Sequence, residues 1–185
     1  DAGATLAGGF AEGGPHHQVG ERLGIQWPIH PVSPIAWTVH LPDGRAVPQW
    51  TELERWRTER QEAFPSAAAF WKTQALLADI AWDVSSRHFP WPPQDCRDLV
   101  DLARALRPKT LRSIPYILRT MGALMPDDDP MLRTFVDANL LISAQTTADQ
   151  ANALYGSAAL DLPRRGVNHV EGGVGGIADT LVKSI

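Results

Sequence analysis

The chain has little cysteine, no long apolar run and no excess of basic charge, and each of these absences excludes a class of protein. With one cysteine in 185 residues, Cys96, no disulfide can form within the chain. The lack of any 18-residue apolar stretch argues against a transmembrane helix. The formal net charge of −4 argues against a nucleic-acid partner, which would need a strongly basic face. A lone thiol is typical of a reducing compartment, so we expect a cytoplasmic location.

The order of sequence patterns predicts an α+β fold, with a small mixed or antiparallel β platform and a mostly helical cap. Residues 1–50 are expected to form a Gly-rich loop and a β-hairpin, whose strands span 35–41 and 46–50 around a turn. Residues 51–160 are expected to be a helical insertion, and residues 161–185 a returning Gly-rich loop and helix. The first residues lack a methionine and a signal peptide, so we expect them to lie inside a longer protein.

Proline and capping residues divide the helical insertion into segments. Thr51, Ser66, Asp95 and Thr147 are each expected to cap a helix. Another helix is expected from Pro108 to about residue 125, interrupted at Pro115, and the most hydrophobic one over 131–145. A short helix is also expected over 16–23, opened by Pro15 and ended by Gly24.

Glycine-rich segments stand at both ends of the chain. Residues 172–176 (GGVGG) lead into a predicted helix and partly match a dinucleotide-binding fingerprint. No second strand or ribose-binding acidic residue follows them, so a complete Rossmann unit is excluded. The run is either a flexible loop or a loop-to-helix junction that presents N–H groups to an anion or an electron-rich ring. If it meets the N-terminal glycine run, the two form one surface for a flat cofactor or another domain.

The sequence offers no catalytic residue and no metal site. His16 and His17 lack ligand spacing, and the run 127–129 (DDD) between two prolines is typical of a helix cap. No supported acid pair or nucleophile–base order is present, so any chemistry would depend on a cofactor. The seven tryptophans pack a core or line a cavity for a large apolar ligand.

Several motifs, taken in order, resemble the phytoene desaturase family, in particular the bacterial carotenoid desaturases. They are residues 1–9 (DAGATLAGG), 132–145 (LRTFVDANLLISAQ), 152–158 (NALYGSA) and 170–174 (VEGGV). The resemblance covers nearly the whole chain, including residues 23–25 (LGI) and 41–44 (LPDG). It implies the substrate domain of an amine-oxidase-like flavoprotein, with the Rossmann domain that binds FAD lying outside these residues.

This resemblance implies an FAD-dependent oxidoreductase that desaturates or isomerises a polyene by hydride transfer to the flavin. The expected partners are the polyene, the protein's own FAD-binding domain and a membrane surface on the inner face; the fragment alone is expected to be inactive. The residues expected at the flavin are Thr5, Gly8, Gly9, Gly172 and Gly173. Those expected at the substrate are Phe70, Trp71, Trp82, Leu140, Leu141 and His169.

Two other functions remain open from the sequence. One is an amine-oxidase-like flavoenzyme domain for a different substrate, which an aromatic cage beside the flavin would favour. The other is a noncatalytic helical module that binds lipid or protein. The helix over 131–142 is apolar enough either to pack in a core or to contact lipid.

Overall fold

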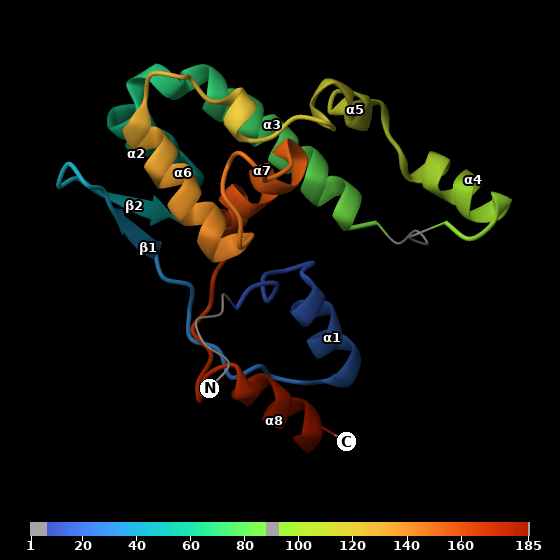
Figure 1. Ribbon diagram of the computed structural model, residues 1–185. Coiled ribbons are helices and arrows are strands. Elements are labelled where there is room, and N and C mark those ends of the chain that lie inside the picture. The colour runs from blue at the N-terminus through green and yellow to red at the C-terminus, as the bar shows by residue number, and fades with distance from the viewer. Residues whose placement is uncertain (1–6, 88–92, 185) are drawn as a thin grey trace. The chain divides into compact units, whose positions relative to one another are not determined.

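The computed structural model describes residues 7–87 and 93–184 (Figure 1). These residues form eight α-helices and one antiparallel two-stranded sheet, which confirms an α+β fold that is mostly helical. The chain divides into two compact units. Unit 1 combines residues 1–63 with 162–185, and unit 2 consists of residues 64–161.

The elements of unit 1 are α1 (Pro15–Leu23), β1 (Ile35–His40), β2 (Ala46–Trp50), α2 (Leu53–Ala63), the 3-10 helix η4 (Leu162–Arg165) and α8 (Gly175–Lys183). Those of unit 2 are η1 (Pro65–Ala67), α3 (Ala68–Ser85), α4 (Cys96–Ala105), α5 (Pro108–Leu111), η2 (Ile114–Tyr116), η3 (Gly122–Leu124), α6 (Pro130–Ser143) and α7 (Ala153–Asp161). Helix α2, which the sequence assigns to the helical segment 51–160, packs against β2 and belongs to unit 1.

Helix α1 begins and ends where its sequence predicts. Pro15 occupies the first turn, where its missing N–H costs no hydrogen bond. Gly24 ends the helix in the left-handed region at φ 65°, and its N–H donates to the carbonyl of Gly20. The expected helix over 16–23 is therefore confirmed.

The β-hairpin is also confirmed, with Val39 opposite Val47 and both side chains buried. Its turn is closed by the N–H of Leu41, which donates to the Arg45 carbonyl at 2.8 Å. The Asp43 carboxylate accepts from the Arg45 N–H at 3.0 Å and pairs with its guanidinium at 2.7 Å. The hydrogen bond from the Arg45 N–H is the main reason that the pKa of Asp43 lies below its usual value.

The cap of α2 differs from the expected one. The Glu52 carboxylate accepts from the backbone N–H groups of Glu54 and Arg55, at 2.8 and 3.0 Å. The Thr51 hydroxyl instead donates to the carbonyls of Ser33 and Pro34, which fastens the chain beside β1. Thr51 as the side-chain cap was therefore the wrong prediction, because its hydroxyl has nearby carbonyl acceptors.

Unit 2 is built on α3, α6 and α7, which surround an aromatic core. Phe135 on α6 is fully buried, and its ring centroid lies 5.1 Å from that of Phe64 and 6.3 Å from that of Trp71. Gln74 crosses from α3 to α7, where its side-chain amide donates to the Ser157 carbonyl at 2.9 Å. Gly156 allows close packing, because a Cβ there would stand 2.4 Å from Met121 Cγ.

The helix caps of unit 2 are partly as expected. Asp95 caps α4 by accepting from the N–H groups of Arg97 and Asp98, as the sequence predicts. Asp129, within the acidic run expected to cap, accepts from the Leu132 N–H. Ser66 does not cap α3, because its hydroxyl donates to the Asp129 carboxylate at 2.8 Å.

Two expected helices are shorter in the structure. The segment from Pro108 to residue 125 breaks into α5, η2 and η3, because prolines stand at 108 and 115 and the chain turns again before η3. The last helix of unit 2 begins at Ala153 rather than after Thr147. Asn152 provides the cap, its side-chain oxygen accepting from the Leu154 N–H at 3.0 Å.

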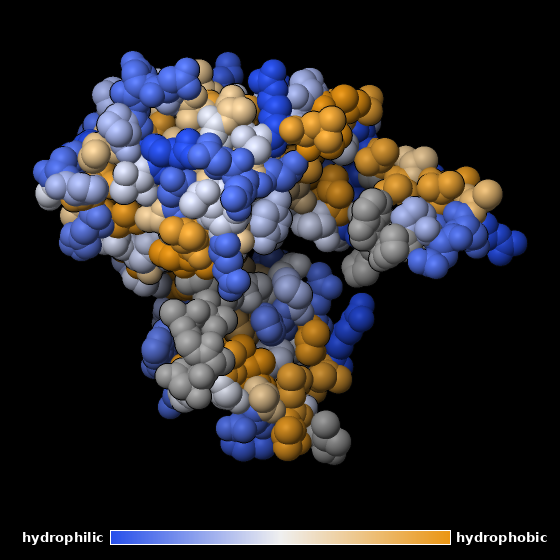
Figure 2. All heavy atoms as spheres, viewed as in Figure 1, coloured by the Kyte–Doolittle hydropathy of each residue, from blue (hydrophilic) through white to orange (hydrophobic). Residues whose placement is uncertain are grey.

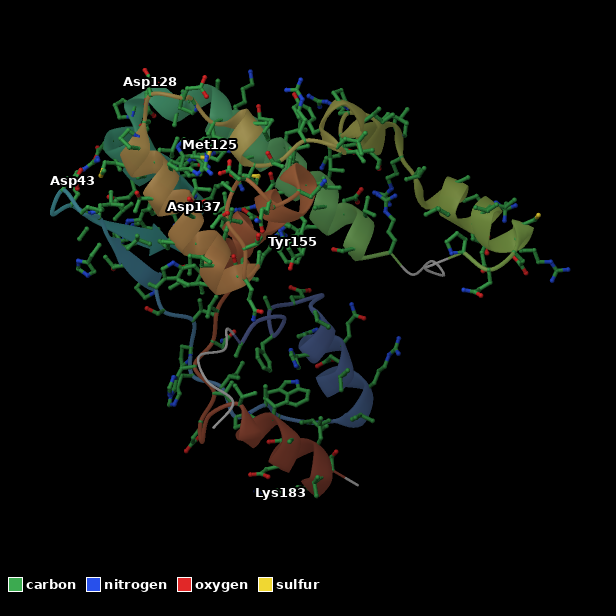
Figure 3. The ribbon with its side chains drawn as sticks, viewed as in Figure 1. Asp43, Met125, Asp128, Asp137, Tyr155 and Lys183 are labelled. Atoms are coloured by element: carbon green, nitrogen blue, oxygen red, sulfur yellow. The ribbon has the colours of Figure 1, made fainter. Side chains whose placement is uncertain are left out.

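The turn before α7 is held by charged groups of α6. The Asp137 carboxylate, labelled on α6 in Figure 3, accepts from the Ala148 N–H at 2.7 Å. Arg133 pairs with both Asp137 and Asp149, and the hydrogen bond to Asp149 is the main cause that raises the pKa of its guanidinium. These bonds explain why residues 147–150 form a turn instead of continuing a helix.

Candidate functional site

The first glycine-rich segment is folded around an aromatic trio in unit 1. The Phe10 ring stacks on His16 with centroids 4.4 Å apart, and Trp27 stands edge-on to both rings. His16 Nδ1 donates to the Gly8 carbonyl at 2.8 Å. The carbonyl of Gly9 accepts from the N–H groups of His16 and His17, at the start of α1. The first turn of α1 therefore uses these two N–H groups within the protein.

Main-chain pairing joins the two ends of unit 1. The Asn168 N–H donates to the Ala7 carbonyl at 2.7 Å, and its side-chain amide donates to the His30 carbonyl at 3.1 Å. Ile29 forms an antiparallel bridge with Val170. Ala7, Phe10 and Val170 share one buried cluster, so the described part of the N-terminal segment lies beside the chain that leads into the second glycine run. From Ala7 onward, the N-terminal segment is thus paired with residues 168–170, just before the second glycine run.

The second glycine run forms a turn that ends on α8. Gly172 and Gly173 have φ values of 74° and 75°, in the left-handed region that favours glycine. The N–H groups of Gly173 and Gly176 donate to carbonyls within the turn. Among the described residues, no atom lies within 4 Å of where a Cβ would stand on Gly172, Gly173 or Gly175. The run therefore exposes backbone without side chains, and two of its N–H groups are already used within the turn and cannot bind a ligand.

A pocket of about 400 Å³ opens beside this junction. Its lining is mostly apolar, and its two polar side chains are those of His30 and Asn168. Its lining residues are Phe10, Ala11, Ile29, His30, Pro31, Val32 and Asn168. The exposed imidazole of His169 lies near, with its ring centroid 5.3 Å from that of His30. This arrangement can hold a flat or apolar group, with hydrogen-bonding side chains at one edge.

Four of the five residues predicted to contact the cofactor are described by the structure, and they lie in or next to the paired segments of unit 1. Gly8 and Gly9 lie at the aromatic trio, and a Cβ on Gly9 would stand 2.8 Å from the Pro15 ring. Gly172 and Gly173 form the open turn, whereas Thr5 lies outside the described residues. Sequence reasoning missed Phe10, Ile29 and Asn168 as pocket residues. No local periodicity marks them, since residues 27–30 read WPIH and residues 167–170 read VNHV.

The residues expected at the substrate lie in unit 2, apart from His169. Phe70, Trp71 and Leu140 are buried in the aromatic and aliphatic core, with 2, 4 and 0 % of their surface exposed. Trp82 is half-buried on α3, and Leu141 on α6 is 54 % exposed. The structure thus places His169 beside His30, which lines the pocket, and keeps three of the others in a packed core. Their role toward a substrate stays a prediction.

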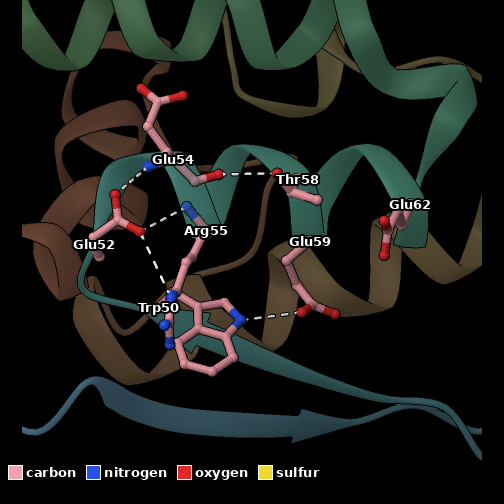
Figure 4. Close-up of a pocket in the computed structure, with 7 residues that line it drawn as sticks. All are labelled: Trp50, Glu52, Glu54, Arg55, Thr58, Glu59 and Glu62. Atoms are coloured by element: carbon pink, nitrogen blue, oxygen red, sulfur yellow. Dashed lines mark hydrogen bonds and ion pairs between the residues drawn. The ribbon is translucent and has the colours of Figure 1, made fainter.

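A second pocket, of about 390 Å³, lies on α2 and has a different chemistry (Figure 4). The Trp50 indole N–H donates to Glu59 at 3.0 Å, and the Arg55 guanidinium stands 5.1 Å from the centre of the Trp50 ring. Glu52, Glu54 and Glu62 complete an acidic rim. A cationic ligand would bind over the face of the Trp50 ring, but the Arg55 guanidinium already occupies that position. We therefore assign this pocket to packing between α2 and β2 and not to a ligand.

Residues considered for metal binding have other partners. His16 donates to Gly8, and Asp129 caps α6. Over residues 7–87 and 93–184, no group of three or more His, Cys, Asp or Glu side chains is placed to hold a metal ion. Across the same residues, no helix is both long enough and apolar enough to cross a membrane.

Comparison of the chain with protein-family models, with curated proteins and with solved structures found no match. The geometry of the junction in unit 1 is therefore the basis for assigning a function.

The open turn allows a matched pair of substitutions. Gly173→Ala should lower the free energy of unfolding by about 1–2 kcal/mol, because a side chain disfavours φ 75° even in open space. Gly175→Ala should leave it unchanged or raise it by up to about 1 kcal/mol, because Gly175 starts α8 without a left-handed φ. Denaturant unfolding of both variants measures the difference, and equal effects would contradict the described turn.

Proposed function

We propose that the chain is the substrate-side domain of an FAD-dependent oxidoreductase of the carotenoid desaturase type. One observation carries the proposal: the first glycine-rich segment pairs through Ala7 with Asn168, four residues before the second glycine run, beside an apolar pocket. This is the arrangement expected if both segments face a cofactor. The motif order noted above supports the same class.

The residues at the junction fit the ring system of a flavin. Glycine at 172, 173 and 175 leaves the backbone bare, so a flat ring could approach it without meeting a side chain. FAD would supply a hydride acceptor, which agrees with the lack of an acid–base pair in this chain. The described residues contain no parallel sheet for a dinucleotide, so the phosphates and adenosine would be held by a separate Rossmann domain.

The chain's own residues would bind and orient an apolar substrate. Phe10 and Ile29 would exclude water from the pocket, since their side chains form its apolar wall. His30 and His169 would mark its polar edge. A polyene hydrocarbon fits such a lining better than an amine, because these described residues contain no carboxylate to pair with a cation. A cytoplasmic location is part of the proposal.

The test is the visible absorbance spectrum of the protein purified from its complete reading frame, beside the 185-residue chain. We expect a flavin spectrum in the longer protein and none in the shorter one. Gly173→Val in the longer protein should reduce the bound flavin, while Gly44→Val, at an open left-handed glycine in the hairpin turn, should retain it. Flavin missing from the longer protein after addition of FAD would refute the proposal, and equal flavin in both variants would refute the role of the turn.

A second candidate is a noncatalytic helical module that binds lipid or protein. The exposed apolar residues of α4 and α5 favour it. It predicts no flavin in either form of the protein and no loss of binding on substitution of Gly173.

A further inference from the structure

Exposed apolar side chains gather in one segment of unit 2. Of the fifteen large hydrophobic residues exposed in the described chain, seven lie between residues 99 and 118. They are Leu99, Val100, Leu106, Leu111, Ile114, Ile117 and Leu118. Figure 2 shows hydrophobic residues over α5 and along α4. Leu118 is 97 % exposed, so it contributes nothing to the core of unit 2. A segment of this kind needs an apolar environment outside the unit.

Helix α4 is amphipathic but buries none of its described side chains. Leu99, Ala103 and Leu106 follow each other at helical spacing on one side. Arg97 and Arg104 lie on the opposite side, seven residues apart. Such a pattern ordinarily faces a core, and here it faces solvent.

The same segment is the basic part of an acidic protein. Residues 96–119 contain six arginine or lysine residues and two aspartates, whereas the whole chain has a net charge of −4. One of these aspartates, Asp101, pairs with Arg104 at 3.3 Å. Arg107 pairs with Asp83 at 3.3 Å and Lys109 with Asp79 at 3.9 Å, so the segment is fastened to α3. Long basic side chains among exposed leucine and isoleucine are typical of helices that lie in the interface of an anionic membrane.

We propose that residues 96–119 dock unit 2 onto an anionic lipid surface. The apolar side chains enter the boundary between headgroups and acyl chains, and the arginines contact lipid phosphates. A second copy of the same surface is disfavoured, because it would bring two basic segments together. The helix over 131–142 is not the docking element, since Leu132, Phe135 and Leu140 are fully buried. This inference stands on the surface alone and does not depend on the proposed flavin.

Vesicle sedimentation of the protein tests the inference with two matched pairs of variants. The apolar pair is Ile114→Gln with Leu118→Gln, and its control is Leu23→Gln with Val182→Gln, which are 58 and 71 % exposed in unit 1. The charge pair is Arg112→Gln with Arg119→Gln, and its control is Arg22→Gln with Lys72→Gln. The vesicles contain phosphatidylcholine alone or with an equal part of phosphatidylglycerol, at low salt.

We expect binding only where phosphatidylglycerol is present. Removing two arginines should weaken it about 25-fold, at about fivefold for each basic residue near the surface. The apolar pair should weaken it by about tenfold or more. Both controls should bind as the parent does, and circular dichroism should show all variants folded.

The lone cysteine provides a second readout, since Cys96 is exposed at the start of α4. An environment-sensitive fluorophore on Cys96 should shift to the blue when anionic vesicles are added. Binding that is independent of phosphatidylglycerol, or equal in all variants, would overturn the inference. Self-association without lipid that the apolar variants abolish would overturn it too, in favour of a second copy as the occupant.

Discussion

Phe135→Ala is expected to lower the free energy of unfolding of unit 2 by about 3–5 kcal/mol. The Phe135 side chain is fully buried on α6, and its ring packs with those of Phe64 and Trp71 in a triangle. Truncation would remove its apolar contacts and leave a cavity that packed helices on both sides cannot close. A loss of this size is a large part of the stability of an ordinary domain, so the variant should be partly unfolded under mild denaturant.

Denaturant unfolding and amide hydrogen exchange of α6 measure the effect. Phe135→Leu should cost less than about 2 kcal/mol, because most of the apolar volume stays. Tyr155, labelled on α7 in Figure 3, is 58 % exposed, and Tyr155→Ala should change stability by no more than about 0.5 kcal/mol. If Phe135→Ala cost no more than Tyr155→Ala, the described core of unit 2 would be wrong.

The second large effect is expected in unit 1, at Phe10. Phe10→Ala should cost about 3 kcal/mol, because Phe10 is only 8 % exposed and packs with Ala7 and Val170. It also removes the ring that stacks on His16, so the first glycine segment would lose its support. The hydrogen bond from the Asn168 N–H to Ala7 should then open more often.

Hydrogen exchange at the Asn168 N–H distinguishes this result from a general loss of stability. Phe10→Leu keeps an apolar side chain and removes only the aromatic pairing, which is worth about 0.5–1.5 kcal/mol. Val19→Ala, on the exposed side of α1, serves as the control. Unchanged exchange at Asn168 in Phe10→Ala would show that the aromatic trio does not hold the junction.

Elements set by local chemistry could be predicted from the sequence. Pro15 and Gly24 fix the ends of α1 through their own backbone preferences, and Asp95 caps the helix that follows it directly. Thr51 and Ser66 were assigned wrongly for a shared reason. Their hydroxyls donate to groups elsewhere in the fold, the carbonyl of Pro34 and the carboxylate of Asp129, and a local pattern does not contain these partners.

The candidate site could be predicted only in part. The high glycine content of both segments predicted that they belong to the site, because glycine is favoured where φ is left-handed or where another group comes close to the backbone. The pairing of Ala7 with Asn168 joins residues from opposite ends of the chain, and no periodicity reports such a contact. For the same reason the sequence could not tell that Phe70 and Leu140 pack in the core of unit 2 while the pocket forms in unit 1.

The division of the chain has a consequence for the order of folding during synthesis. Unit 2 is one continuous stretch, residues 64–161, so every residue of its core has been synthesised before residue 162. Unit 1 needs Asn168 and Val170 to complete its contacts with Ala7 and Phe10, and these two residues are synthesised after unit 2. On the ribosome the inserted unit is therefore complete first, and the N-terminal segment waits for its partner until residues 168–170 have been synthesised.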